Sequence, residues 1–259
     1  MSAPHPAPPV VVIEGVIGAG KSVLTCALAG SAHKRGLETC VVPEPVKVWE
    51  NSGALKKFYE NPKDNAYAFQ TFVYATRVVA IADAVRDSPH ADLYLLDRSP
   101  ATDRVFMAAQ DVSPVERAMY ETWCDTYDRM QPLDLRRATA VYLQTPVATC
   151  MERIARRGRA GELDLNPGQD RSLGQGHVAS RSRALPLGVT TAYQTVLAQR
   201  HDEFLLGVGG APPTCPYARV VCVPAAVAVG DFTMGGSDRE AIADAVLDSV
   251  LGVNAPAHM

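Results

Sequence analysis

A glycine-rich segment near the amino terminus has the residue types and the spacing to bind phosphate. It matches the pattern G-x-x-x-x-G-K-[ST] in full, in the run Gly15, Val16, Ile17, Gly18, Ala19, Gly20, Lys21 and Ser22. The glycines allow backbone N–H groups to converge on phosphate oxygens, and a helix that starts here adds its positive dipole end. Lys21 would then reach the β- and γ-phosphates of a nucleotide, and the Ser22 hydroxyl would bind Mg²⁺. A strand–turn–helix whose glycines serve only close packing is the alternative.

A carboxylate follows the second apolar run of the chain. Glu44 stands between two prolines, directly after the run Thr39–Val42 and Pro43. The prolines restrict the backbone on both sides, so the carboxylate is aimed in one direction. Because the carboxyl ends of parallel strands face one crevice, we expect Glu44 to lie across from the glycine-rich segment. There it can take the proton of a hydroxyl that attacks the γ-phosphate. A surface glutamate in a proline-rich turn is the alternative.

An acidic and a basic residue follow the third apolar run. The run at 93–96 is followed by Asp97, Arg98, Ser99 and Pro100. We expect Asp97 on the Mg²⁺ side of the phosphates and Arg98 beside the acceptor oxygen and the transferring phosphoryl group. Ser99 is expected to cap the next helix, with proline at its first position. A purely structural pair of aspartate and arginine is the alternative.

Arginines cluster after the fourth apolar run. Arg153 and Arg157 are four residues apart, so they share a helix face, and Gly158 and Arg159 follow. An arginine-rich lid that closes over the γ-phosphate would stabilise charge in the transition state and exclude water. The alternative is a solvated basic face or a nucleic-acid patch, and the net charge of −3 weakens the nucleic-acid version.

One helical pattern carries polar side chains on a stripe that faces the core. Gln70, Val73 and Arg77 fall at positions i, i+3 and i+7. Buried polar groups need partners, and Asp103, in the next helical segment, is the obvious partner for Arg77. An ordinary salt bridge to solvent is the alternative for Arg77.

The elements that must position these residues alternate between strand and helix. Near-continuous apolar runs, typical of strands buried on both faces, occur at Val10–Ile13, Thr39–Val42, Asp92–Leu96, Ala138–Leu143 and Arg219–Val223. Helical patterns occur at Ser22–Arg35, Ala66–Arg86, Pro100–Ala109, Pro114–Arg129, Pro146–Arg156, Thr190–Leu206 and Asp238–Leu251. Two of these carry capping boxes, at Ser113–Glu116 and Ser237–Glu240. The alternation predicts an α/β fold with a five-stranded, doubly wound parallel sheet flanked by helices.

Composition limits the class of protein. The chain has 259 residues, enough for one large domain, and we expect that domain at 10–252. Residues 1–9 form a proline-rich tail without the features of a secretory signal or a mitochondrial presequence. Residues 164–185 are rich in Gly, Ser, Arg and Gln, which predicts a mobile surface loop.

Partners and compartment follow from the same counts. Six scattered cysteines without a C-x-x-C pair are typical of reduced thiols in an intracellular, cytoplasmic protein without a cysteine metal site. The longest wholly apolar stretch, Val220–Val229, contains a proline and is too short to span a bilayer. We therefore expect neither a nucleic acid nor a membrane as the main partner.

Together these segments resemble the deoxynucleoside kinases. The resemblance is carried by GVIGAGKS, VVPEPVKVW, FYENP, FQTF, LLDRSPATDR, CMERIARRGRAGE and the late GDF, in the right order over roughly residues 10 to 232. The pattern is most similar to deoxycytidine and deoxyguanosine kinases, while DRSP and the run RGRAGELDL resemble herpesvirus thymidine kinases. That family has the P-loop fold of the nucleotide monophosphate kinases. The resemblance implies transfer of the γ-phosphate of ATP to a deoxynucleoside 5′-hydroxyl, with Mg²⁺.

The resemblance also implies roles for individual residues. Glu44 would be the general base and Arg98 the partner of the 5′-oxygen, and Asp97 stands where the cellular enzymes carry a glutamate near Mg²⁺. Tyr59 and Glu162 would hold the sugar 3′-hydroxyl. The implied base contacts are Trp49, Phe69, which would stack, and Gln70, which would pair with the base edge. The lid would comprise Arg153, Arg157 and Arg159, and the adenine-side loop would contain Asp231 and Phe232.

The couple of Arg77 and Asp103 resembles the cytidine- and purine-accepting members of the family, so we expect deoxycytidine or a purine deoxynucleoside as substrate. Two departures stand out: residues 164–185 lengthen the segment after the lid, and Asp97 is shorter than glutamate. Family members are commonly homodimers, which suggests an interface on the helices at 66–86 and 114–130.

Three other functions remain open. A thymidine kinase of the herpesvirus type would share most motifs. A thymidylate kinase would share the phosphate loop and the Asp97-Arg98 pair, but it gives no reason for Trp49 or Tyr59 and needs a pocket for an acceptor phosphate. A non-catalytic nucleotide-binding switch would bind ATP without turnover.

Overall fold

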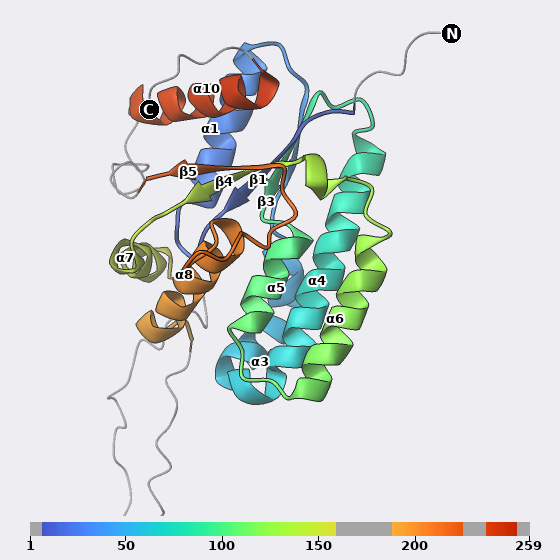
Figure 1. Ribbon diagram of the computed structural model, residues 1–259, viewed down its shortest axis with the longest axis vertical. Coiled ribbons are helices and arrows are strands. Elements are labelled where there is room, and N and C mark those ends of the chain that lie inside the picture. The colour runs from blue at the N-terminus through green and yellow to red at the C-terminus, as the bar shows by residue number, and fades with distance from the viewer. Residues whose placement is uncertain (1–6, 159–187, 225–236, 253–259) are drawn as a thin grey trace, which may run out of the picture.

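The computed structural model describes residues 7–158, 188–224 and 237–252. Five parallel strands form one sheet in the order β2-β3-β1-β4-β5 (Figure 1). Their bounds are Val10–Glu14 for β1, Thr39–Val42 for β2, Leu93–Asp97 for β3, Thr139–Leu143 for β4 and Arg219–Val223 for β5. The predicted doubly wound parallel sheet is confirmed, and each predicted strand lies within one residue of its observed bounds.

Helices connect the strands. Their bounds are Lys21–Lys34 for α1, Val46–Asn51 for α2, Ala54–Glu60 for α3, Pro62–Asp87 for α4, Pro100–Ala108 for α5, Pro114–Asp128 for α6, Val147–Arg157 for α7, Thr191–Leu205 for α8 and Ser237–Leu251 for α10, with a short 3₁₀ helix η1 at Leu135–Arg137. All seven predicted helices are present, although α4 begins four residues before the predicted Ala66. Helices α2 and α3 were missed because six or seven residues are too few to display a helical period.

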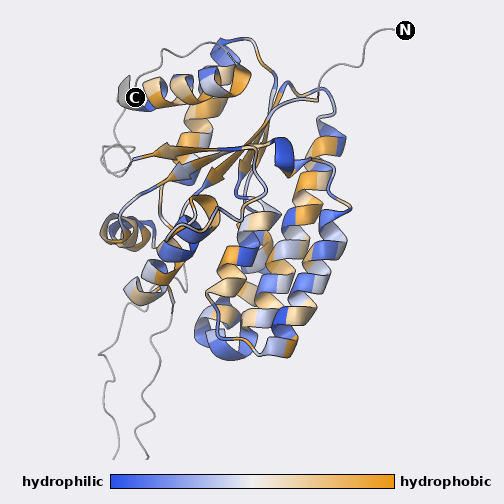
Figure 2. Cartoon of the chain, viewed as in Figure 1, coloured by the Kyte–Doolittle hydropathy of each residue, from blue (hydrophilic) through white to orange (hydrophobic). Residues whose placement is uncertain are grey.

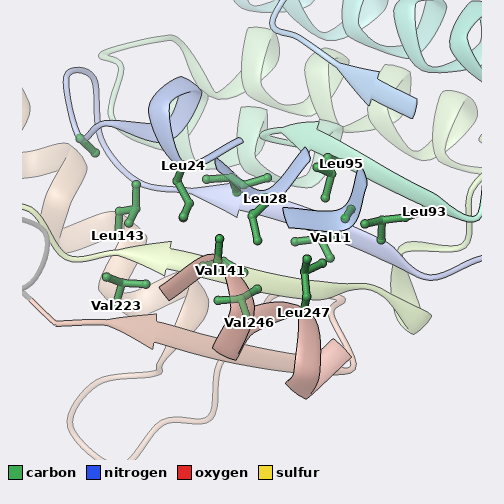
Figure 3. Packing of buried hydrophobic residues seen from close by; sticks show 14 of the residues in the cluster. Val11, Leu24, Leu28, Leu93, Leu95, Val141, Leu143, Val223, Val246 and Leu247 are labelled. Carbon is green, nitrogen blue, oxygen red and sulfur yellow. The ribbon is translucent and has the colours of Figure 1, made fainter. Parts of the chain in front are cut away.

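The two faces of the sheet bury separate apolar layers, because successive side chains of a strand point in opposite directions. One layer lies between the sheet and α1 and α10, and Figure 3 shows part of it. Its members include Val11, Leu93, Leu95, Val141, Leu143 and Val223 from the strands, Leu24 and Leu28 from α1, and Val246 and Leu247 from α10. At roughly 1.5–3 kcal/mol for each large apolar side chain, this layer fixes α1, and with it the glycine-rich loop, against the sheet.

The opposite layer lies between the sheet and α4, α5 and α8. Strand residues such as Val12, Leu96 and Ala140 meet Ile81 of α4 and Val105 of α5 there. Figure 2 shows the strands as an apolar band between helices of mixed character. The strands are therefore buried on both faces, as their near-continuous apolar runs predicted.

Two helix starts have the predicted caps. Ser113 and Glu116 form a reciprocal capping box at the start of α6, with N–H to side-chain oxygen distances of 2.9 and 3.2 Å. At α5 the Ser99 hydroxyl accepts from the Ala101 N–H at 3.1 Å, and Pro100 takes the first helical position. These caps fix where the helix begins after each loop. At the end of α7, Gly158 has φ 60°, as a chain reversal there requires.

The long helix α4 is central to the site. By length and composition alone it could cross a membrane. It packs instead against α3, α5 and α6 and buries Phe69, Gln70 and Arg77, as a core helix does (Figure 1). The first six residues of the predicted tail and the whole of 164–185 lie outside the described residues.

Candidate active site

The glycine-rich loop leads from β1 into α1. Gly15, Gly18 and Gly20 have φ of 143°, 82° and 104°, which L side chains rarely adopt. A Cβ on Gly18 would lie 2.6 Å from the Cys150 carbonyl oxygen of α7, so the tip of the loop rests directly on that helix. Ala19 is buried, and its carbonyl accepts from the Thr145 hydroxyl at 2.8 Å. The loop is thus held from outside by α7 and by the end of β4.

A cavity of about 1090 Å³ opens beside this loop. It collects residues from the carboxyl ends of β2 and β3, from α2 to α5 and from α7. Most of the sequence-predicted site residues line it: Gly18, Gly20, Lys21, Ser22, Glu44, Trp49, Tyr59, Phe69, Gln70, Val73, Arg77, Asp97, Arg98, Asp103, Arg153 and Arg157. Arg159, Glu162, Asp231 and Phe232 lie outside the described residues. Gly15 and Ala19 belong to the loop but do not line the cavity.

Glu44 meets two arginines in this cavity. Its Oε1 accepts from Arg98 Nη1 at 2.7 Å and from Arg77 Nη2 at 3.0 Å. Burial by itself would raise the pKa of Glu44, but the positive charges of Arg98, Arg77 and Lys21 outweigh it and hold that pKa well below its usual range. The carboxylate is therefore ionised at neutral pH and points into the cavity with 19% of its side chain exposed.

Lys21, Ser22 and Asp97 lie together at the loop. The Ser22 hydroxyl donates to Asp97 Oδ2 at 3.1 Å, and Lys21 Nζ lies 4.0 Å from Asp97 Oδ1. Within the described residues, that Oδ1 is a buried oxygen without a hydrogen-bond partner. Burial, followed by the positive charge of Arg98, lowers the pKa of Lys21 to about 8. A hydroxyl, a carboxylate and a cation thus surround one point at the start of α1.

Arg77 is a buried residue of α4 whose hydrogen bonds connect that helix to α5 and to the end of β3. Its guanidinium donates to Asp103 Oδ2 at 2.8 Å, to the Asp97 carbonyl at 3.0 Å and to Glu44 at 3.0 Å. Only 3% of the Arg77 side chain and 1% of the Asp103 side chain are exposed. The predicted pairing of these two residues is confirmed, and the solvent-exposed alternative for Arg77 is wrong.

Aromatic side chains form the wall opposite the loop. Phe69 stacks on Phe58 of α3 at a centroid distance of 4.6 Å and meets the edge of Trp49 at 6.1 Å. The Trp49 indole donates to the Thr76 hydroxyl at 2.8 Å, which fixes its ring, and Tyr59 lies beside Phe58. One face of Phe69 is therefore covered by protein, so a stacked ligand would have to use the other face.

Gln70 differs from its aromatic neighbours. Its side chain is polar, only 2% exposed, and lines the cavity. A buried amide of this kind favours a polar ligand that can satisfy it.

The arginines of α7 reach the cavity from the other side. Arg153 donates to the Ala19 carbonyl at 2.9 Å, so it is attached to the glycine-rich loop. Arg156 and Arg157 also line the cavity, although Arg156 was not predicted. Because α7 carries all three, its position relative to the loop sets where positive charge meets a bound phosphate.

Sequence reasoning missed several lining residues. Phe106 lines the cavity and lies under the Arg98 guanidinium at 4.7 Å, and Tyr193 of α8 lines it near the loop. Lys47 lies on α2 and Phe58 on α3, and neither segment was predicted as a helix. The sequence did contain a signal for Phe106, because it follows Asp103 by three residues in a predicted helix and so shares a face with it. Tyr193 had none, because it reaches the site through tertiary packing.

Comparison with known proteins connects this geometry to one family. A family model described as deoxynucleoside kinase matches residues 11–174. Deoxycytidine kinase 2 of Gallus gallus is 30% identical over 60% of this chain and 67% of its own length. Deoxyguanosine kinase of Lactobacillus johnsonii is 33% identical over 61% of this chain and 68% of its own length. Thymidine kinase of Ictalurid herpesvirus 1 is 31% identical over 60% of this chain and 67% of its own length.

Proposed function

The chain belongs to the deoxynucleoside kinase family, which makes it an ATP-dependent kinase of deoxynucleosides, and we propose that the reaction occurs in the cavity between the glycine-rich loop and α4. The γ-phosphate of ATP passes to the 5′-hydroxyl of the nucleoside. The observation that carries this proposal is the ionised Glu44 carboxylate, which faces the cavity across from Lys21 and is held by two arginines.

Glu44 is the proposed general base. Arg98 and Arg77 keep it ionised, so it is ready to accept the proton of the 5′-hydroxyl at neutral pH. Its low pKa makes it a weak base, which suits a loose transition state where the proton leaves late, as the new P–O bond forms. Protonation of Glu44 neutralises the carboxylate beside Arg98, so the positive charge of Arg98 is then available to the transferring phosphoryl group.

Positive charge on the opposite side balances the developing negative charge. Lys21 lies at the start of α1, where a β- or γ-phosphate would meet the backbone N–H groups of the loop. Arg153 and Arg157 approach from α7. The pKa of Lys21, lowered to about 8, leaves it mostly protonated at neutral pH, and a bound triphosphate would raise that pKa.

A magnesium ion fits the residues at the loop. The Ser22 hydroxyl and the Asp97 carboxylate lie 3.1 Å apart, and Asp97 keeps one buried oxygen without a hydrogen bond in the described part of the chain. Mg²⁺ is commonly held by one or two protein oxygens together with phosphates and waters. Ser22 and Asp97 would hold the ion, which would neutralise charge on the β- and γ-phosphates.

The base preference is proposed as deoxycytidine or a purine deoxynucleoside. The buried Arg77–Asp103 pair and the buried Gln70 amide present polar groups to the base, and a base that leaves them unpaired is rejected. A panel of four deoxynucleosides with ATP tests this. We expect kcat/KM for deoxycytidine, deoxyadenosine or deoxyguanosine to exceed that for thymidine. A strong preference for thymidine would favour the herpesvirus-type alternative instead.

Two other activities are separated by the choice of acceptor. A thymidylate kinase would prefer a nucleoside monophosphate to the nucleoside, whereas Trp49 and Tyr59 favour an acceptor without a phosphate. A non-catalytic switch would bind ATP and turn over none of the four nucleosides. Kinetics with the four deoxynucleosides and with thymidine monophosphate as acceptors distinguish all three functions.

The proposed assembly is a homodimer through α4 and α6, which lie side by side (Figure 1). On α6, Val115, Met119 and Trp123 recur every four residues and are 68%, 47% and 46% exposed, and Val79 of α4 is 56% exposed. Large apolar side chains on one face favour association with another apolar surface.

All six cysteines are free thiols, which supports a reducing, cytoplasmic location.

A further inference from the structure

A buried acid lies behind the reactive residues and does not line the cavity. Glu14, the last residue of β1, is fully buried. Its Oε1 accepts from the Tyr217 hydroxyl at 2.5 Å and from the Thr102 hydroxyl. Tyr217 in turn lies 2.7 Å from the hydroxyl of Ser99. Hydroxyls from two separate segments, the first turn of α5 and the segment before β5, therefore converge on one carboxyl group of the central strand.

These contacts hold the first turn of α5. Ser99 caps that helix, and its N–H donates to the Thr102 hydroxyl at 3.4 Å. Glu14 binds the same hydroxyl, so the end of β1 and the start of α5 share a hydrogen-bonded junction. Tyr217 adds the segment before β5 to this junction.

The junction adjoins a strained residue of the site. Arg98 has φ 65°, a left-handed conformation that only glycine adopts readily, and it is the one such non-glycine residue in the described part of the chain. Its N–H donates to the Ile13 carbonyl at 3.0 Å, and its Nη2 donates to the Gly15 carbonyl at 3.0 Å. Strained conformations of this kind persist only where surrounding contacts fix them. The residues on either side of Glu14 provide part of that support.

The chemistry of Glu14 is unusual for a merely structural residue. Its second oxygen, Oε2, is buried and has no hydrogen-bond partner among the described residues. A buried carboxyl with an unpaired oxygen costs stability, and a glutamine could keep its shape without a charge. Two cations, Arg98 and Lys21, face Glu14. Three further groups face it, and burial raises the pKa of each, so that they stay protonated: Tyr217, Tyr142 and Cys215.

We propose that Glu14 is a positioning residue for phosphoryl transfer, an inference that rests on the proposed kinase activity. Its hydrogen bonds with Thr102 and Tyr217 fix the first turn of α5. Asp97 and Arg98 precede that turn directly, so the junction sets where the metal-side carboxylate and the partner of Glu44 stand. Glu14 itself touches neither the nucleotide nor the nucleoside.

The test removes single hydroxyls from the junction. Thr102→Val and Tyr217→Phe each remove one hydrogen bond to Glu14 and preserve the side-chain volume. We expect kcat to fall roughly 10- to 100-fold, because small misplacements of reacting groups have effects of that size, while KM for ATP and nucleoside stays within about threefold. Thr102→Ser keeps the hydroxyl and should recover most of the rate. Glu14→Gln should resemble the two hydroxyl variants if it folds.

Matched controls remove comparable groups from elsewhere in the sheet. Tyr94→Phe removes a buried hydroxyl that donates to the Ser88 carbonyl at 2.8 Å, and Thr139→Val removes a buried hydroxyl at the start of β4. Both should keep a wild-type kcat. The inference is overturned if Thr102→Val and Tyr217→Phe lose no more rate than these controls, or if Thr102→Ser is as slow as Thr102→Val. A wild-type protein without kinase activity would instead contradict the proposed function.

Discussion

At the scale of single residues, the proposed chemistry depends on buried acidic and basic side chains that hold one another at short distances. Glu44 is the clearest case, since two arginines at 2.7 and 3.0 Å hold one of its oxygens. A carboxylate in that environment is ionised over the whole physiological range.

Replacing Glu44 tests its role directly. We expect Glu44→Gln to bind nucleoside with near wild-type affinity and to lose about 10²–10⁴ in kcat, because a general base typically contributes that factor. Steady-state kinetics and calorimetric nucleoside binding measure the two effects. Glu203→Gln, which changes a surface glutamate paired with Arg200 on α8, is the control. Near wild-type turnover in Glu44→Gln would remove this residue from the base role.

Glu14 provides a second residue-scale prediction, on stability. Burial outweighs its two hydrogen bonds and nearby cations and raises its pKa from 4.5 to about 7. Between these values the unfolded chain releases a proton that the folded protein keeps, so rising pH favours unfolding. The contribution of Glu14 is therefore fully present below about pH 4.5 and is lost as the pH rises through about 7, with a total of about 3 kcal/mol.

Glu14→Gln removes that dependence on pH. We expect the stability of the wild type relative to the variant to decrease between about pH 5 and about pH 8, by up to about 3 kcal/mol. Urea unfolding of both proteins across this range measures it. Parallel curves for the two proteins would mean that the pKa of Glu14 is ordinary in the folded state.

At the scale of elements, the position of α7 against the glycine-rich loop controls the phosphate end of the cavity. Gly18 permits the contact, because its φ is 82° and a Cβ would come within 2.6 Å of the Cys150 carbonyl. Arg153 of the same helix is attached to the loop through Ala19. The loop and α7 are therefore in direct contact at two points.

A methyl group at Gly18 should separate them. We expect Gly18→Ala to raise KM for ATP, to leave nucleoside affinity unchanged and to lose about 1–3 kcal/mol of stability from the left-handed backbone. Gly30→Ala in α1 is the control, since a Cβ there meets no atom within 4 Å and alanine favours a helix. Unchanged ATP binding in Gly18→Ala would show that the close contact with α7 is dispensable.

The elements also show what a sequence can and cannot predict. Strands and long helices follow from local periodicity, because apolar runs and stripes at i, i+3 and i+7 are set by backbone geometry. The Arg77–Asp103 pair was predictable for another reason, since a buried arginine needs a partner and an aspartate stands in the next helix. Contacts such as Tyr217 with Glu14 join residues far apart in the chain, and no spacing rule encodes them. The short helices α2 and α3 could not be predicted for a different reason. They are stabilised by the packing of Trp49, Leu55 and Phe58 in one apolar cluster.

At the scale of the whole molecule, the exposed apolar face of α6 predicts self-association. Met119→Asp places a charge in its centre, and we expect this variant to sediment as a single 27.7 kDa chain where the wild type sediments at twice that mass. Val208→Asp, at an exposed valine in the loop after α8, is the control and should leave the mass unchanged. A wild type that is monomeric at micromolar concentration would contradict the proposed dimer.

Because one guanidinium joins Asp103, the Asp97 carbonyl and Glu44, the choice of base and the speed of reaction are physically linked. Efforts to broaden the substrate range by replacing Arg77 would also strip a positive neighbour from the catalytic carboxylate. We therefore expect Arg77 variants that accept new nucleosides to turn them over more slowly than the wild type turns over its own substrate. Compensating substitutions that recover the rate are expected where a lysine or arginine can reach the vacated side of Glu44.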